Sequence, residues 1–335
     1  MEAGLMLLVA LVFIFVAAEL FTNALECVGE RMGVSEGVTG SIFAAVGTAL
    51  PETIVPIVAI LAGGASIQVN HAVGMGAILG APFMLGTLSL CLIGAFVGIK
   101  RGWNTTLKPE STGFRRDVKV FLLAYTLVIV AAVLPVSWHD ARLLVACTLF
   151  VIYFMYLLRT MHASKTLVEE GYGTEADSDL YFKRFAGDTT PVAVAQLVLA
   201  LAVLVSGAKL FVHGIETTST YLGVGALVLS LLIVPIATEL PEKVNSILWI
   251  KKGRDTLAFG NITGAMVFQG TMIPGIGMLL LPWHFQSGYA ALAVVLAIAG
   301  SAWLWFLESS GRLNGKMLFF NGILYLVFIV YAVIL

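Results

Sequence analysis

The sequence is poor in charge. Asp, Glu, Lys and Arg make up 12% of its 335 residues, whereas about 25% is usual for a soluble domain. The formal net charge is −1, so nothing indicates a basic surface for nucleic acid. Apolar residues reach 59%, above the roughly 45–50% of soluble domains. These shares exclude an ordinary soluble protein and favour a chain embedded in a lipid bilayer.

Residues that carry enzyme or redox chemistry are also scarce. The three cysteines lie in apolar runs without disulfide or metal-ligand spacing, and the five histidines are scattered. No His-Glu-x-x-His, Gly-x-Ser-x-Gly, Asp-rich diphosphate or ATP-binding motif is present. We therefore expect neither an enzyme nor an ATP-driven pump, and no cofactor.

Apolar runs long enough to cross a bilayer as helices recur along the chain. They lie near 4–28, 36–62, 70–98, 118–137, 141–159, 191–213, 224–250, 256–281, 287–307 and 316–335. Lipid offers no hydrogen bonds to the backbone, so each run is expected to be a helix. The predicted fold is an all-α polytopic membrane protein with ten transmembrane helices.

Basic residues indicate the orientation. Sixteen of the 19 Lys and Arg follow odd-numbered runs. Because Lys and Arg concentrate in cytoplasmic loops, both termini are expected to be non-cytoplasmic, in a protein of the cell (plasma) membrane. The acidic stretch 160–190 is interpreted as a solvated cytoplasmic linker between two five-helix halves, 1–159 and 191–335.

The two halves repeat at a fixed offset of 190 residues. The matched pairs include Leu50 and Leu240, Pro51 and Pro241, Glu52 and Glu242, Gly74 and Gly264, and Gly80 and Gly270. Since five helices is an odd number, the second half enters the bilayer in the opposite sense. The pattern therefore predicts inverted-topology repeats, a common transporter plan.

Two matched carboxylates lie near the middle of their runs, Glu52 and Glu242. A carboxylate in hydrocarbon is costly unless it has a partner. Two of them at repeat-related positions predict one shared central site for a cation.

A proline precedes each of these glutamates and frees the carbonyl four residues earlier, which belongs to Gly47 in the first repeat and Ala237 in the second. A broken helix at mid-membrane is tolerated where the freed backbone lines a cavity. Carbonyl and carboxylate oxygens suit hard cations such as Ca²⁺, Mg²⁺ or Na⁺.

Further oxygen donors stand near each glutamate. Thr48 and Thr238 lie four residues earlier on the same helix face, where their hydroxyls can either cap the backbone or bind the ion. Gln269 can supply an amide oxygen, whereas its repeat mate Leu79 cannot.

The glutamates belong to two related hexapeptides. Residues 47–52 read Gly-Thr-Ala-Leu-Pro-Glu, and residues 237–242 read Ala-Thr-Glu-Leu-Pro-Glu. They resemble the two alpha repeats of the calcium/cation antiporter superfamily, which includes the sodium/calcium exchangers and has the pattern Gly-Thr-Ser-Leu-Pro-Glu. The resemblance covers essentially the whole chain. It implies ten spans and alternating access, in which spans one and six slide past the other eight. It also implies that Glu52 and Glu242 bind a divalent cation and that the threonines flank it.

The chain departs from the family pattern at several polar positions. Family serines are replaced by Ala49, Glu239, Met75 and Ala265, and a family Asn and Asp by Leu79 and Gln269. Several of those serines belong to the family's Na⁺ sites, so the counter-ion is left as Na⁺ or H⁺. A site with fewer protein ligands would suit a partly hydrated Mg²⁺, so the divalent ion is left as Ca²⁺ or Mg²⁺.

Glu239 and Lys243 are four residues apart and allow two interpretations. They either pair on one helix face, or Glu239 faces the ion. Lys243 is also a candidate resident cation that the substrate displaces.

The sequence therefore predicts a secondary active antiporter that moves Ca²⁺ or Mg²⁺ in exchange for Na⁺ or H⁺. The alternative is a passive cation channel, which would need a continuous polar path. The candidate ion ligands are Glu52, Glu242, Thr48, Thr238, Glu239, Gln269, Gly47 and Ala237.

Overall fold

The computed structural model describes residues 2–31, 49–62, 66–169, 179–285 and 287–334. Regular structure in these ranges is helical, and an isolated β-bridge joins Thr106 and Asn314. The helices up to the middle of the chain are α1 (Glu2–Arg31), α4 (Leu50–Ala62), α5 (Ile67–Met84), the π-helix η2 (Leu85–Ser89), α6 (Leu90–Arg101), α7 (Ser111–Val133) and α8 (His139–Glu169). Those that follow are α9 (Lys183–Ala186), α10 (Thr190–Leu222), α11 (Ala226–Thr238), α12 (Leu240–Lys251), α13 (Asp255–Leu280), α14 (Gly288–Ser309), α15 (Gly315–Phe319) and α16 (Asn321–Ile334).

Seven helical segments in the described ranges are long and apolar enough to cross a membrane. Two shorter apolar helices, Leu50–Leu61 and Ala226–Ile236, accompany them. Every predicted run contains described helix, although the first part of run 36–62 lies outside the described residues. The all-helical membrane class is thus confirmed, while the count of ten spans remains a prediction.

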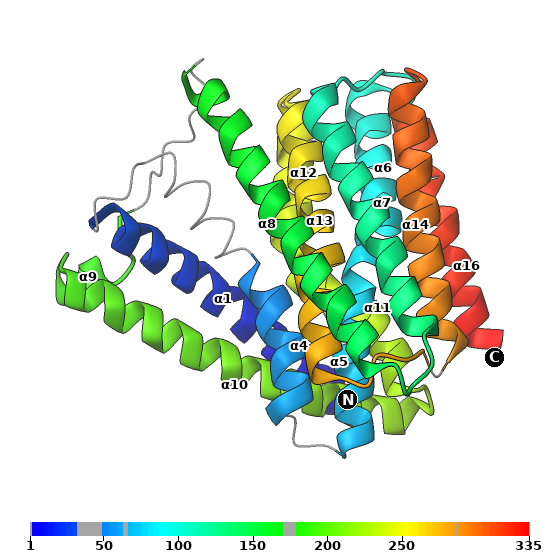
Figure 1. The fold of residues 1–335 in the computed structure, drawn as a ribbon. Coiled ribbons are helices and arrows are strands. Elements are labelled where there is room, and N and C mark those ends of the chain that lie inside the picture. The colour runs from blue at the N-terminus through cyan, green and yellow to red at the C-terminus, as the bar shows by residue number, and fades with distance from the viewer. Residues whose placement is uncertain (1, 32–48, 63–65, 170–178, 286, 335) are drawn as a thin grey trace. The chain divides into compact units, whose positions relative to one another are not determined.

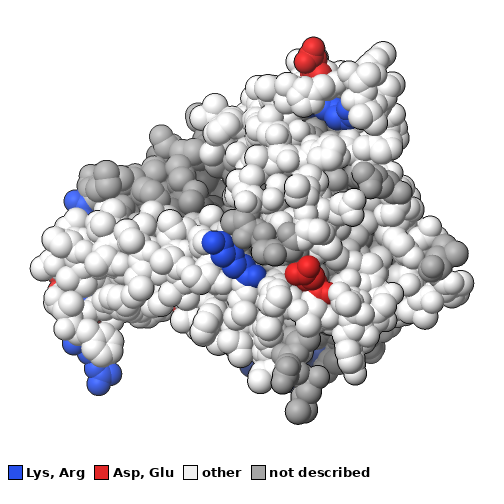
Figure 2. All heavy atoms as spheres, turned by 90° about the horizontal axis from the view of Figure 1, so that it is seen from below, with Lys and Arg blue, Asp and Glu red and all other residues white. Residues whose placement is uncertain are grey.

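The helices turn large apolar side chains outward. Leu144, Val151 and Leu158 on α8 are more than half exposed, as are Leu326 and Val330 on α16. Figure 2 shows a face on which charged side chains are few and most atoms belong to other residues. Exposed apolar side chains in such rows favour contact with lipid over contact with water.

Packing divides the chain into two compact units. Unit 1 comprises Met1–Asn70 and Leu157–Gly223, and unit 2 comprises His71–Tyr156 and Val224–Leu335. Each unit draws on both of the halves 1–159 and 191–335. The units are groups defined by contacts, whereas the halves are defined by sequence repetition and stay a prediction.

In unit 1, α1 and α10 pack side by side (Figure 1). Two glycines on α10, Gly207 and Gly214, permit this approach. A Cβ on Gly214 would lie 2.7 Å from Leu7 Cδ2, and one on Gly207 would lie 3.2 Å from Phe13 Cβ. Small residues seven positions apart share a helix face and let two helix backbones approach closely.

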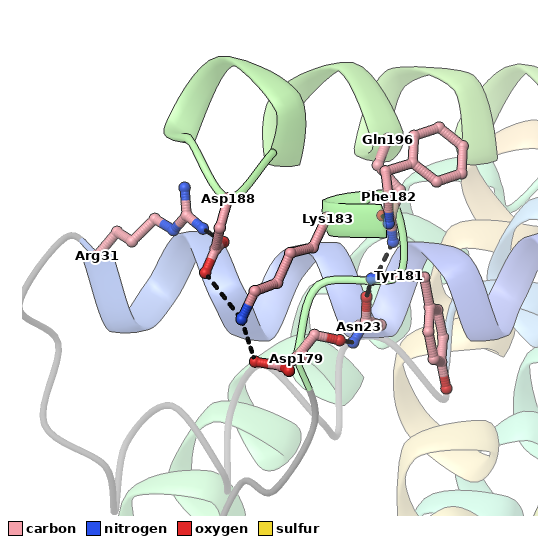
Figure 3. Close-up of polar contacts among 8 residues, drawn as sticks. All are labelled: Asn23, Arg31, Asp179, Tyr181, Phe182, Lys183, Asp188 and Gln196. Carbon is pink, nitrogen blue, oxygen red and sulfur yellow. Dashed lines mark hydrogen bonds and ion pairs between the residues drawn. The ribbon is translucent and has the colours of Figure 1, made fainter. Parts of the chain in front are cut away.

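A polar cluster ties the chain before α10 to this helix pair (Figure 3). We name it the linker-end cluster; its members are Asn23, Asp179, Tyr181, Phe182 and Gln196. Gln196 is fully buried, and its Nε2 donates to Asn23 Oδ1 at 3.0 Å while its Oε1 accepts from Phe182 N at 2.9 Å. Asn23 Oδ1 also accepts from Tyr181 N at 3.0 Å, and Asn23 Nδ2 donates to Asp179 O at 3.2 Å. Every amide atom of the two buried side chains is therefore hydrogen-bonded.

Apolar and ionic contacts surround the linker-end cluster. Leu180 is 3% exposed and packs with Ala24, Cys27 and Ala193. At the surface, Lys183 Nζ lies 2.9 Å from Asp179 Oδ1. The predicted linker 160–190 thus has ordered ends, because α8 continues to Glu169 and residues 179–188 pack on α1 and α10.

In unit 2, glycines again mark the closest helix approaches. A Cβ on Gly80 would lie 2.6 Å from Leu231 O and 2.8 Å from Pro235 Cγ, so α5 presses against α11 there. A Cβ on the repeat mate Gly270 would lie 2.7 Å from Phe121 Cδ2, where α13 meets α7. Two glycines singled out by the repeat therefore lie where helices pack closely.

Candidate cation-binding site

The predicted run 224–250 is broken where the proline predicts. Helix α11 ends at Thr238, α12 begins at Leu240, and Glu239 lies between them with φ −91° and ψ 4°. Pro241 occupies the first turn of α12, where its missing N–H is tolerated. The break places Glu239 at the junction of two helix segments inside unit 2.

Glu239 is fully buried and points to α13. Its Oε1 accepts a hydrogen bond from Nε2 of Gln269, which is 2% exposed. The sequence predicted both as ion ligands, and the structure brings them together from helices 30 residues apart in the chain.

Two oxygens of this pair have no hydrogen-bond partner in the described part of the chain. They are Glu239 Oε2 and Gln269 Oε1, and both are buried. Buried polar atoms normally find a partner, because an unpaired one costs roughly 1–3 kcal/mol. A carboxylate oxygen and an amide oxygen side by side are ligands of the kind that Ca²⁺ and Mg²⁺ prefer.

Lys243 reaches back toward the helix break. It is 8% exposed, and its Nζ donates to Pro235 O at 3.1 Å. The same carbonyl accepts from Glu239 N at 3.1 Å, which uses both of its lone pairs. The ammonium also attracts the Glu239 carboxylate electrostatically. We name Pro235, Glu239, Lys243 and Gln269 the hinge cluster.

This geometry bears on the two interpretations of Glu239 and Lys243. Both side chains are buried. Glu239 bonds to Gln269 while Lys243 bonds to a backbone carbonyl, and the two attract each other. The attraction agrees with pairing and the buried carboxylate agrees with an ion ligand, so the choice between the two interpretations stays a prediction.

Thr238 is 2% exposed, and its hydroxyl donates to Val234 O at 3.3 Å. This is the ordinary side-chain contact to the carbonyl four residues earlier and does not involve the freed Ala237 carbonyl, so the choice between the two predicted roles stays a prediction. The hydroxyl oxygen can still accept from, or coordinate, another group.

The remaining predicted ligands are described less fully. Glu52 lies in the first turn of α4 in unit 1 and is 5% exposed. Gly47 and Thr48 lie outside the described residues, as do the side chains of Ala237 and Glu242. The complete ligand set is therefore a prediction, and only Glu239 and Gln269 are brought into contact in the part described.

One contact near the site was missed by sequence reasoning. Ser246 Oγ on α12 donates to Ala258 O at 3.1 Å and accepts from Asn261 Nδ2 at 3.0 Å. It fixes the start of α13 against α12 and so helps to aim Gln269 at Glu239. The signal available was Asn261, the polar residue next to Gly260 in an otherwise apolar segment.

No group of three or more His, Cys, Asp or Glu side chains in the described ranges is placed to hold a metal ion. The oxygen donors of the hinge cluster are the Glu239 carboxylate, the Gln269 amide and the Pro235 carbonyl.

A family model described as "Sodium/calcium exchanger protein" matches residues 3–161 and 192–335. The chain belongs to this family. The match covers both sides of the linker and leaves out residues 162–191, as expected if that stretch is peripheral to the exchanger fold.

Relatives of this exchanger are similar over nearly their whole lengths. CaxA of Alkalimonas amylolytica is 27% identical over 342 residues, covering 97% of this chain and 98% of the relative. The sodium/calcium exchanger MaX1 of Methanosarcina acetivorans is 24% identical over 362 residues, with 98% of each chain covered. The crystal structure of the H⁺/Ca²⁺ exchanger CAX superposes with a TM-score of 0.70 at 17% identity, covering 99% of this chain and 82% of that one. At this identity the superposition shows the shared fold.

Proposed function

We propose that this exchanger is a secondary active antiporter that moves a divalent cation, Ca²⁺ or Mg²⁺, across a lipid bilayer in exchange for Na⁺ or H⁺. The observation that carries the proposal is a pair of buried oxygens at a helix break, Glu239 Oε2 and Gln269 Oε1, which have no hydrogen-bond partner in the ranges that the structure describes. Membership of the sodium/calcium exchanger family supports the same chemistry.

The proposed ligands extend the hinge cluster to the repeat-related carboxylates. In this proposal Glu52 and Glu242 bind the divalent cation, and Glu239 and Gln269 contribute to its shell. Further oxygens near the bound cation come from the hydroxyls of Thr48 and Thr238 and from the carbonyls of Gly47 and Ala237. The burial of Glu52 supports this role, because a carboxylate is kept in an apolar core when it has a cation to meet.

The choice of ions rests on the departures from the family pattern. Replacement of family serines by Ala49, Met75 and Ala265 removes hydroxyl ligands. Fewer hydroxyls leave room for water, which Mg²⁺ retains more strongly than Ca²⁺ does. The relatives include both a sodium/calcium exchanger and an H⁺/Ca²⁺ exchanger, so both counter-ions are carried forward.

The proposed architecture is ten transmembrane helices in two inverted repeats, 1–159 and 191–335, joined by a cytoplasmic linker at 160–190. The protein is placed in the cell membrane, with both termini on the non-cytoplasmic side. Alternating access follows from movement of α1 and α10 against the other helices. The extensive packing of α1 against α10 supports their movement as one element.

Uptake into proteoliposomes tests the proposal. Purified protein is reconstituted, and entry of Ca²⁺, Mg²⁺ or Mn²⁺ is followed under an imposed outward Na⁺ gradient or pH gradient. We expect divalent uptake that requires one of the two gradients and that is lost in Glu52→Gln and in Glu242→Gln. Lys209→Met serves as the matched control, because Lys209 is an exposed intramembrane residue outside the proposed site.

Two results would contradict the proposal. Divalent flux that runs without any counter-ion gradient, at rates beyond those of a carrier, would indicate the channel. Unchanged exchange in both Glu52→Gln and Glu242→Gln would show that these two carboxylates do not bind the transported ion.

A further inference from the structure

The hinge cluster contains a charge pair that the first repeat lacks. At the offset of 190 residues, Glu239 matches Ala49 and Lys243 matches Thr53. In the first repeat the Thr53 hydroxyl donates to Ala49 O at 2.7 Å, an ordinary helical contact. The second repeat thus has both an added carboxylate and an added ammonium, which together leave the net charge of the site unchanged.

The ammonium of Lys243 donates to a backbone carbonyl and is attracted by a buried carboxylate. Pro235 O is 3.1 Å from Nζ, and the Glu239 carboxylate is close enough to attract it. A lysine ammonium is a compact point charge with three donors and no acceptor. In a buried site such a charge persists only where oxygens and an opposite charge compensate for its lost hydration.

The direction of the side chain fits this placement. Side chains on a helix lean toward its N-terminus, so a residue four positions after Glu239 points back to the break. Gly80 brings α5 against Pro235 on the other side, and a Cβ there would collide with Pro235 Cγ at 2.8 Å. The Pro235 carbonyl is therefore held in place for the ammonium.

We infer that the Lys243 ammonium is a tethered cation that holds the place of one monovalent ion beside Glu239. Wild-type protein then binds its divalent substrate without Na⁺ at Pro235 O and Glu239. The inference rests on the proposed function for the role of the site, and it narrows the counter-ion: Na⁺ does not use Glu239. Removal of the ammonium leaves a carboxylate, a backbone carbonyl and the Gln269 amide oxygen, which form a site for Na⁺.

Sodium-dependent thermal stability of purified protein tests the inference without any transport assay. A ligand that binds only folded protein raises the melting temperature in a saturable manner. The melting temperature is measured in NaCl and, at matched ionic strength, in choline chloride, up to concentrations on the order of 100 mM. The four proteins are wild type, Lys243→Met, the double variant Glu239→Gln with Lys243→Met, and Lys209→Met.

We expect Lys243→Met to gain a saturable Na⁺ stabilisation that wild type and Lys209→Met lack. The double variant should lose that gain, because the carboxylate is gone. Absence of a gain in folded Lys243→Met, or persistence of the gain in the double variant, would overturn the inference.

A comparison that keeps Lys243 covers the case in which Lys243→Met does not fold. Wild type and Glu239→Gln should respond identically to Na⁺. A Na⁺ response present in wild type and lost in Glu239→Gln would show that Na⁺ already binds Glu239, and would overturn the inference. Failure of divalent exchange in liposomes would instead contradict the proposed function, since the melting measurements do not depend on it.

Discussion

Two buried polar clusters, each built around a glutamine, differ in how fully their atoms are paired. In the linker-end cluster, both amide atoms of Asn23 and of Gln196 are hydrogen-bonded. In the hinge cluster, Glu239 Oε2 and Gln269 Oε1 are buried without a hydrogen-bond partner in the described part of the chain. A fully paired cluster stabilises one structure, whereas a cluster with unpaired oxygens is suited to receive a cation.

The difference is also one of charge. The buried amides of the linker-end cluster bond mostly to backbone groups and are neutral, and its ion pairs lie at the surface. The hinge cluster buries a carboxylate and an ammonium away from water. The proposed function gives the second cluster a binding role, whereas the full pairing of the first indicates a structural one, and substitutions can separate the two roles.

The largest effect is expected from Glu239→Gln. Removal of a buried ligand charge should weaken divalent binding roughly 100-fold, since each tenfold corresponds to about 1.4 kcal/mol. The melting temperature without divalent ion should also fall, because the buried Lys243 ammonium loses its opposite charge, although glutamine keeps the shape and can still bond to Gln269. Isothermal titration with Ca²⁺ and Mg²⁺ measures the loss; an affinity equal to wild type would end the ligand assignment.

Gln196→Leu should lower the stability of the protein without changing its divalent affinity. It leaves the Phe182 N–H and one Asn23 lone pair without their partners, at a cost of about 2 kcal/mol of unfolding free energy. Divalent affinity should stay at the wild-type value. Denaturant unfolding in detergent gives the stability; a large loss of affinity in the folded variant would mean that the linker-end cluster also serves binding.

Gln269→Leu is the matched partner of that variant. It removes one ligand oxygen and should weaken divalent binding on the order of tenfold. Stability should fall by less than in Gln196→Leu, because Gln269 Oε1 has no hydrogen-bond partner among the described residues. Isothermal titration and denaturant unfolding again measure affinity and stability. A stability loss equal to that of Gln196→Leu, with unchanged divalent affinity, would show that both clusters have only a structural role.

Gly80→Ala disturbs the hinge cluster from the side of α5. Its Cβ would meet Leu231 O at 2.6 Å, so α11 must shift at a cost of about 1 kcal/mol. Gly260→Ala is the control, since a Cβ there meets nothing within 4 Å. Gly80→Ala should have a lower transport rate and a lower melting temperature than Gly260→Ala. Equal values in the two variants would show that the close approach of α5 and α11 is unimportant.

The smallest effect is expected at the surface of the linker end. The hydrogen bond and the charge of Asp179, with Asp188 nearby, raise the pKa of Lys183 above its ordinary value. A raised lysine pKa means that the pair contributes below the unfolded pKa and is lost only as pH rises through the folded pKa. The difference in melting temperature between wild type and Lys183→Met should therefore be small and constant at pH values well below the ordinary lysine pKa of about 10.4, and decrease only above it. A difference that disappears already near neutral pH would contradict the pairing.

Much of the fold could be predicted from the sequence, because bilayers impose simple rules. Runs of apolar residues fix helices, and Pro241 fixes the break beside Glu239. Gly80 and Gly270, which the repeat singled out, lie where α5 meets α11 and α13 meets α7, but the repeat does not tell which helices meet there.

The site could be predicted only in part. The spacing of Glu239 and Lys243 allowed two interpretations, and the choice depends on the rotation of α13, which carries Gln269 to the carboxylate. The linker-end cluster was missed because Asn23 and Gln196 are isolated polar residues whose partners lie more than a hundred residues away. Local patterns do not contain such long-range contacts.

The most direct measurement is a structure of the protein determined with its divalent ion, with Mn²⁺ or Ca²⁺ located by anomalous scattering. The account predicts a peak within about 2.6 Å of the Glu239 carboxylate, with the Gln269 amide oxygen turned to the ion. A divalent ion bound at saturation elsewhere, while Glu239 contacts only Gln269 and Lys243, would contradict it.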